Sequence, residues 1–277
     1  MTSLRLISAT LFAAICVSGC ATVEEGPQSM PDLAQPPKLG LVRIGSSSVT
    51  SGLDTFEQSM AMALFFDPSA ASPVCTRSQV GTCSIYRCGS LSGVPSSGDI
   101  SIKGGNEDVV LSPSQLGTYS EYRSTSTLVF QRGQSISVSA VGKDVPAWQT
   151  SLGIPSPVFA LQTPSPARID LMWVLSKRQD LSLSWSALPS GSTVRVELTQ
   201  DMGTSQGSLI ECVFDGSKGA GLVPSGVLSQ LQVTQGQSHA IGVLIGPGIE
   251  SKLSPMGYEV SVFGIGVGRT GIATLTE

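Results

Sequence analysis

The feature that most constrains the fold is a recurrent alternation of apolar and polar residues in short segments separated by glycine- and proline-rich turns. Side chains on a β-strand point alternately to two faces, so a period of two is typical of a half-buried strand. Strands are predicted at 59–66, 83–88, 99–103, 126–130, 135–140, 170–175, 181–186, 193–198, 209–214, 239–245 and 258–263. Strands that recur at such short intervals predict an all-β chain built of antiparallel β-sandwich modules.

Composition agrees with this fold class. The chain has 31 glycines, and long runs of the strongest helix formers are missing. One segment, 223–231, breaks the β pattern, because Pro224 stands near its start and apolar residues follow at helical spacing. A single short helix is therefore predicted there.

A short stretch carries a resemblance to known sandwiches. Leu181-Ser-Leu-Ser-Trp185, a Pro-Ser-Gly turn and Val194-Arg-Val-Glu-Leu198 together are similar to the opening strands of fibronectin-type or immunoglobulin-like domains. The resemblance covers fewer than twenty residues and implies a sandwich of one of these types or a jelly-roll-like one. Alternation alone places Leu181, Leu183 and Trp185 on one face, which predicts a core position for Trp185.

Prolines mark the predicted boundaries. Residues 21–38 contain four prolines, three acids and few apolar residues, a composition typical of a disordered tether. A second proline-rich stretch, 155–166, divides the predicted strands into modules at 39–163 and 164–277, which could also merge into one large sandwich.

Four cysteines of the β region predict disulfides in an exported protein. Cys75 and Cys83 flank a predicted hairpin and are expected to pair, which leaves Cys88 to pair with Cys212. Cys83 and Cys88 are five residues apart on one strand and should face opposite sides, so they are not expected to bond each other. A zinc site is the alternative, but no Cys-x-x-Cys occurs and the chain has one histidine.

The N-terminus gives the most specific functional signal. Arg5 precedes a largely apolar run, 6–17, which is shorter than a membrane-spanning helix and has the length of a signal peptide. The run ends in Val17-Ser18-Gly19-Cys20, which resembles the lipobox of bacterial lipoproteins. An ordinary secretory signal cleaved near Ala21 is the alternative.

The resemblance to lipoproteins implies that residues 1–19 are removed and that Cys20 is lipidated with several acyl chains, palmitate among them. One acyl chain holds a protein to a membrane only marginally, whereas two or more hold it stably. Residues 20–38 would then be the lipidated cysteine and its tether. Because Ala21 replaces the aspartate that retains such proteins at the inner membrane of many diderm bacteria, the resemblance also implies an outer-membrane location.

Two glycine motifs fit catalytic or cofactor patterns but not their structural context. The segment 203–207 matches G-x-S-x-G, but it joins two predicted strands and is expected to be a hairpin loop, not a strand-to-helix elbow. The segment 266–271 matches G-x-G-x-x-G, but too few residues follow it for the helix that binds a dinucleotide. It is expected to be a glycine-rich final turn.

Three further groups of residues have the chemistry of possible sites. Asn106, Glu107 and Asp108 cluster oxygen atoms in a glycine turn and are the weak candidates for calcium ligands, although a solvated turn is the favoured interpretation. His239 begins a predicted strand and has no carboxylate patterned around it in the sequence, so it is expected to be an ordinary strand-end histidine. Of the aromatic residues Tyr119, Tyr122, Trp148 and Trp173, most are expected in the core and no more than one or two on a recognition surface.

Charge and motifs together favour some functions over others. The formal net charge is −4, and no basic stripe is present that could neutralise phosphates, so nucleic acid is not an expected partner. We therefore expect a non-enzymatic binding or structural protein of the cell envelope that needs no cofactor. Its expected partners are the membrane, contacted through Cys20, and an envelope protein or glycan. A calcium- or glycan-binding module and a hydrolase of envelope polymers are the alternatives.

Overall fold

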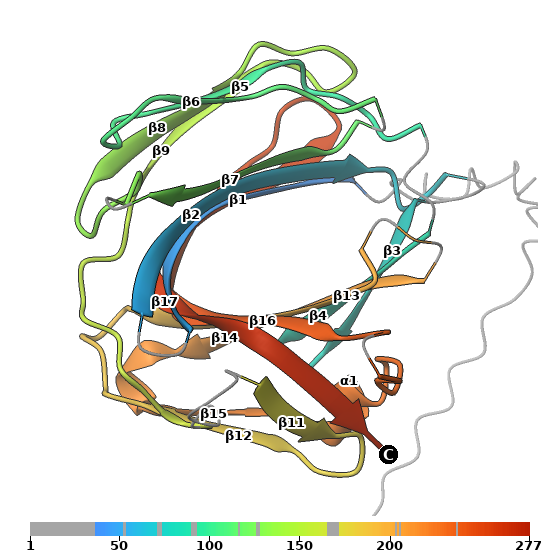
Figure 1. Ribbon diagram of the computed structural model, residues 1–277. Helices are drawn as coiled ribbons and strands as arrows, with labels where there is room; N and C mark the ends of the chain where they lie inside the picture. Colours follow the sequence, from blue (N-terminus) through green and yellow to red (C-terminus); the bar gives the residue numbers. More distant parts are fainter. Residues whose placement is uncertain are drawn as a thin grey trace, which may run out of the picture. The chain divides into compact units, whose positions relative to one another are not determined.

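The computed structural model describes residues 37–277 except 52–53, 71–73, 90–92, 116, 126–127, 165–171, 203, 205 and 237. The predictions for the signal peptide, for Cys20 and for most of the tether lie outside these residues. The described part is almost entirely β-structure, as predicted, and its strands form three sheets (Figure 1).

The largest sheet has ten strands. Nine follow one another in the order β3 (Cys75–Val80), β4 (Cys83–Cys88), β14 (Gly207–Asp215), β13 (Thr193–Gln200), β16 (Ile241–Leu253), β17 (Tyr258–Thr276), β1 (Lys38–Ser51), β2 (Asp54–Phe66) and β7 (Tyr119–Thr125), and β11 (Met172–Ser176) pairs with the far end of β17. Most neighbours are antiparallel, but β1 and β11 both run parallel to β17. The expectation of purely antiparallel sheets is therefore corrected at these two pairs, where β17 joins strands that are distant in the sequence.

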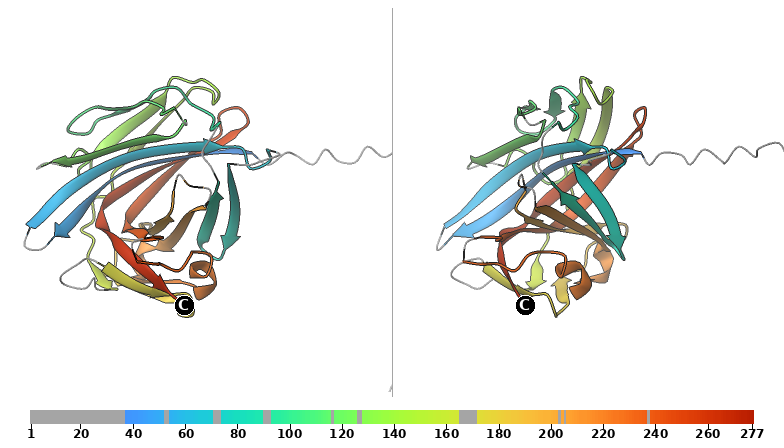
Figure 2. Two further views of the ribbon diagram at one scale, coloured as in Figure 1. Left: turned by 45° about the vertical axis from the view of Figure 1, so that its right-hand side comes forward. Right: turned by 90° about the vertical axis from the view of Figure 1, so that its right-hand side faces the viewer.

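Two smaller sheets cover parts of the ten-stranded sheet, as Figure 2 also shows. One has the order β6 (Val109–Leu111), β5 (Ile100–Lys103), β8 (Ser135–Ala140) and β9 (Trp148–Gly153), and the other β10 (Leu161–Thr163), β12 (Leu181–Trp185) and β15 (Ala220–Val223). The short elements η1 (Gly216–Lys218) and α1 (Ser225–Leu228) flank β15. The helix predicted within 223–231 is confirmed as α1. Residues 128–130, predicted as part of a strand, form an irregular segment instead.

Alternation along the strands divides the ten-stranded sheet into two faces. On β13, Val194, Val196 and Leu198 point to a hydrophobic core shared with the three-stranded sheet. Val42 and Ile44 on β1 and Val260 on β17 likewise point to a core shared with the four-stranded sheet. Burial of each such side chain contributes about 1.5–3 kcal/mol. Both small sheets therefore cover the same, convex face of the curled ten-stranded sheet (Figure 1).

The prediction of a core position for Trp185 is confirmed. Its side chain is buried in the core under the three-stranded sheet, and its indole Nε1 donates a hydrogen bond to the carbonyl of Gly216 at 2.8 Å. This bond satisfies the one polar group of a side chain that otherwise packs against apolar neighbours.

Glycines allow β16 and β17 to approach closely where the sheet curls. A Cβ added to Gly268 would lie 2.5 Å from the carbonyl oxygen of Ile245, so no larger residue fits there without movement of the backbone. The pairing register of the two strands shifts between Ile245 and Gly248, in the segment that contains Pro247. The segment 266–271 is therefore part of strand β17, and the expectation of a glycine-rich final turn is wrong.

The ten-stranded sheet contains strands from both predicted modules, and four strands of the second module separate two groups of strands from the first. Strands β13, β14, β16 and β17 come from 164–277 and lie between β4 and β1, which come from 39–163. Within the described residues, the boundary near Pro164 thus does not separate two sheets.

Candidate functional site

The other, concave face of the ten-stranded sheet carries charged side chains around a polar cavity of about 270 Å³. The cavity is lined by residues from β3, β4, β13, β14, β16, β1 and β17, and three of its residues are cationic and three anionic: Arg77, Arg195, Lys252, Glu211, Glu250 and Glu259. We call it the polar cavity.

Arg195 is the buried centre of this cavity. Its guanidinium contacts Glu211 through Nη1, and Nη2 lies 3.2 Å from Oε2 of Glu250. The same guanidinium stands over the ring of Phe263, with Cζ 3.8 Å from the ring centroid. A cation on the face of an aromatic ring is attracted by the ring quadrupole. The charge of Arg195 is thus balanced on three sides, which fixes its side chain.

The cationic groups nearer the rim are held less tightly. Arg77 lies over the ring of Tyr86 at 5.8 Å and its Nη2 is 3.4 Å from the hydroxyl of Ser84. Lys252 is 60% exposed, and its Nζ is 3.7 Å from Glu250. Burial and the nearby carboxylate of Glu211 raise the pKa of Tyr86, which keeps its phenol neutral at physiological pH. The rim therefore offers two cations that a ligand could engage at little desolvation cost.

A second buried ion pair spans the concave face beside the polar cavity. Nε of Arg43 on β1 is 3.0 Å from Oε1 of Glu197 on β13, although the contact lacks the alignment of a hydrogen bond. Both residues are almost completely buried. Burial raises the pKa of Glu197, while the positive charge of Arg43 opposes that rise.

Sequence reasoning missed this charged face, although a signal was present. Arg195 and Glu197 alternate with valines on one predicted strand, and Glu211 lies on the next. The antiparallel register places Glu197 directly opposite Glu211. In a chain with only 13% charged residues, charges gathered on two adjacent strands indicate a charged face.

The cysteines form two disulfides, but not in the expected pairs. Cys75 bonds Cys88, and Cys83 bonds Cys212. The predicted hairpin exists, but it turns at Gly81-Thr82, so Cys75 lies opposite Cys88 and Cys83 lies opposite Val80. On its other side, β4 places Cys83 opposite Cys212 of β14. The expectation that Cys83 and Cys88 do not bond each other is correct.

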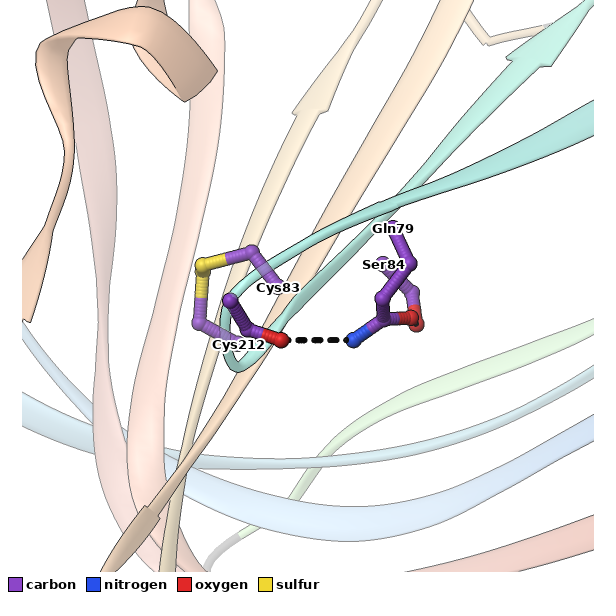
Figure 3. Close-up of a disulfide and its surroundings, with 5 residues drawn as sticks. Gln79, Cys83, Ser84 and Cys212 are labelled. Atoms are coloured by element: carbon purple, nitrogen blue, oxygen red, sulfur yellow. Dashed lines mark hydrogen bonds between the residues drawn. A yellow bond between two sulfur atoms is a disulfide. The ribbon is translucent and has the colours of Figure 1, made fainter. Parts of the chain in front are cut away.

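Figure 3 shows the Cys83–Cys212 disulfide beside two residues of the polar cavity. Ser84 donates a hydrogen bond to Oε1 of Gln79 at 2.7 Å, and Nε2 of Gln79 donates to the carbonyl of Gly81 at 3.0 Å. The disulfide attaches the β3–β4 hairpin to β14, while the two hydrogen bonds brace the hairpin itself, which forms one wall of the polar cavity.

His239 has a carboxylate partner that the sequence did not reveal. Its Nδ1 contacts Oδ2 of Asp201, 38 residues away along the chain. Pairing of β13 with β16 brings the two together, since Gln200 lies opposite Ile241. Among the described residues these two are the non-glycine residues with positive φ, at 51° and 60°. Asp201 begins the connection 201–206 between β13 and β14, whereas His239 lies just before β16. The antiparallel pairing of β13 with β14 confirms the predicted hairpin; Gly203 and Ser205 lie outside the described residues.

The weak calcium candidates do not converge. The side chain of Asn106 uses both polar atoms within the protein, because Nδ2 donates to the carbonyl of Leu128 at 2.7 Å and Oδ1 accepts from Gln134 at 3.0 Å. Glu107 and Asp108 are exposed. In the part of the chain that the structure describes, no three His, Cys, Asp or Glu residues are grouped so as to hold a metal ion.

Three of the four aromatic residues considered for recognition are buried: Tyr119, Trp148 and Trp173. The hydroxyl of Tyr119 accepts from the amide of Ser97 at 2.8 Å, and Nε1 of Trp148 donates to the hydroxyl of Ser97 at 3.0 Å. The side chain of Tyr122 lies outside the described residues.

Comparisons with known proteins add little. No protein-family model matches the chain, and no curated protein is similar to it. One solved chain, from a study of the host cell surface retention of a 1.5-MDa bacterial ice-binding adhesin, aligns over 85% of this chain and 99% of its own length at 10% identity. Its TM-score of 0.18 is too low to indicate a shared fold. No helix among the described residues has the length and apolar character needed to cross a membrane.

Proposed function

We propose that the protein is an exported lipoprotein, anchored at the bacterial outer membrane through Cys20, that acts by binding a ligand and not by catalysis. The anchor rests on the resemblance of residues 17–20 to a lipobox. The two disulfides support export, because such bonds persist mainly in oxidising compartments.

The observation that carries the binding proposal is the polar cavity. Its volume of about 270 Å³ suits a small ligand, and its wall is stiffened by two disulfides and by the fixed guanidinium of Arg195. The cationic and anionic residues balance each other, so the complementary ligand carries charges of both signs. A short peptide has this property, since it presents an ammonium and a carboxylate together.

The aromatic residues favour a peptide over a sugar. Sugar rings stack on free aromatic faces, but Arg195 stands over one face of Phe263 and Arg77 over one face of Tyr86. Both aromatic side chains are also buried. The peptide is therefore the ligand class that we propose for the polar cavity.

The anchor is tested by metabolic labelling of cells that express the full chain with an alkyne fatty acid. The wild type should carry the label and sediment with membranes, whereas Cys20→Ala should lose both properties. Cys16→Ala is the matched control, because Cys16 lies in the segment expected to be removed. A Cys20→Ala protein that keeps the label would refute the anchor.

Binding is tested by calorimetry of the full chain in detergent with the dipeptide Glu-Lys as probe. Arg77→Gln and Lys252→Gln should each weaken binding, by roughly tenfold for about 1.4 kcal/mol of lost contact. Lys103→Gln, an exposed change at the end of β5 outside the cavity, should leave affinity unchanged. Equal affinity in all four proteins, or no heat at all with the dipeptide, would refute the peptide proposal.

A further inference from the structure

A second cavity opens on the concave face and has a different chemistry. Its volume is about 260 Å³, and its lining includes Met60, Met62 and Met202. A small adjoining cavity of about 40 Å³ shares Arg43, Met62 and Met202 with it, so these side chains lie between the two spaces. We call the larger space the methionine cavity.

The methionines reach this cavity from two sides of the concave face. On β2 the side chains alternate, so Ala61 and Ala63 point to the buried core while Met60 and Met62 point into the cavity. Met202 comes from the connection between β13 and β14. Of the four methionines whose side chains the structure describes, three line this cavity and the fourth, Met256, is 86% exposed.

Thioethers give the cavity a specific ligand preference. A methionine sulfur is a soft, neutral donor, and soft thioether ligands select monovalent copper over the hard divalent cations. Such a ligand needs no deprotonation, whereas cysteine and histidine must lose a proton before they bind a metal. The nearby charge of Arg43 is balanced by Glu197 at 3.0 Å, which limits its repulsion of a cation.

We propose that Met60, Met62 and Met202 form a binding site for a soft monovalent cation, Cu(I). The methionine cavity and the polar cavity share no lining residue. The proposed copper site is therefore independent of the proposed peptide ligand. Met60 and Met62 are partly exposed and Met202 is 38% exposed, so solvent reaches the side chains that line the methionine cavity.

The proposal is tested by anaerobic titration of the full chain in detergent with Cu(I) held by the coloured chelator bicinchoninate. The wild type should withdraw one equivalent of copper. Met60→Leu, Met62→Leu and Met202→Leu should each lower the affinity at least tenfold, and exchange of methionine for leucine keeps the packing volume nearly unchanged. Met256→Leu, the matched control, should bind as the wild type does.

A second measurement reports binding even if one variant folds poorly. In wild-type protein with carbon-13-labelled methionine methyl groups, Ag(I) as a stable substitute should shift the resonances of Met60, Met62 and Met202 together and leave that of Met256 in place. A shift of Met256 alone, or an unchanged affinity in the three cavity variants, would overturn the proposal, because copper would then bind at exposed thioethers or elsewhere.

Discussion

At the scale of single residues, Arg43 and Glu197 show the sharpest conflict between charge and burial. Both side chains are more than nine-tenths buried, and their charged atoms are 3.0 Å apart on the concave face. Removal of a charge from water costs several kcal/mol, and an ion pair recovers that cost only when its geometry is good. The contact lacks hydrogen-bond alignment, so the pair orients β1 against β13 more than it stabilises the fold.

This view predicts the outcome of a double-mutant cycle at pH 7. Arg43→Met should lower the free energy of unfolding by about 3–5 kcal/mol, because it leaves a buried carboxylate without its cation. Addition of Glu197→Leu should recover most of that loss, since an apolar pair of similar volume replaces the charges. Urea denaturation of the four proteins measures the coupling. If the double variant is less stable than Arg43→Met alone, the pair contributes more than this view allows.

The raised pKa of Glu197 makes a second prediction about pH. Because the folded state raises this pKa, the folded protein holds the proton more tightly than the unfolded chain does. The stability contributed by this group is complete below the ordinary carboxyl pKa of about 4.3 and is lost as pH rises through the folded value. Relative to Glu197→Gln, the wild type should therefore lose unfolding free energy above about pH 4.5, with a slope of at most about 1.4 kcal/mol per pH unit. A flat difference between the two unfolding curves contradicts the raised pKa.

At the scale of strands, the sequence predicts where strands occur better than it predicts which strands pair with one another. The apolar alternation correctly identifies β4 and β8 to the residue, because side-chain periodicity is a local property. Pairing depends on the register, which is set by the position of a turn: a hairpin turn at Gly81-Thr82 is what excludes a Cys75–Cys83 bond. The polar cavity shares this limit, since its residues come from strands that only the tertiary fold brings together.

The two disulfides should differ in their effect on stability. The Cys83–Cys212 bond closes a loop with a sequence separation of 129, and the Cys75–Cys88 bond one of 13. By the loop-entropy model, a disulfide that closes a loop of about 100 residues stabilises the folded state by nearly 5 kcal/mol, and one that closes a loop of about 15 residues stabilises it by about 3 kcal/mol. Replacement of Cys83 and Cys212 by alanine should therefore lower the urea midpoint more than replacement of Cys75 and Cys88. An equal or opposite order would mean that hairpin geometry, not chain entropy, governs both effects.

At the scale of the whole described part, strand order could not be predicted from local patterns. The parallel pairing of β1 with β17 joins the first described strand to the last, over more than 200 residues. Composition marks proline-rich stretches as boundaries, but the stretch 155–166 still holds the short edge strand β10, and prolines do not determine which strands pair across them. The resulting sheet uses β17 as the link between its two halves.

This topology predicts that the chain cannot be divided at the proline-rich stretch. A fragment of residues 37–163 contains β1 and β4 but lacks the four strands between them in the sheet. Its β1 would expose the long strand edge that β17 occupies, and the core under the four-stranded sheet would lose Val260 and Val262 of β17 and lie open to solvent there. An exposed strand edge and an exposed apolar surface both promote aggregation. We expect this fragment to be insoluble when produced alone and a fragment of 164–277 to behave likewise, whereas the two produced together should yield more soluble protein than either does separately. Soluble yield and far-ultraviolet circular dichroism measure the outcome. A folded, monomeric 37–163 fragment would show that the four-stranded sheet and β1, β2 and β7 form an independent unit, contrary to the continuous sheet described above.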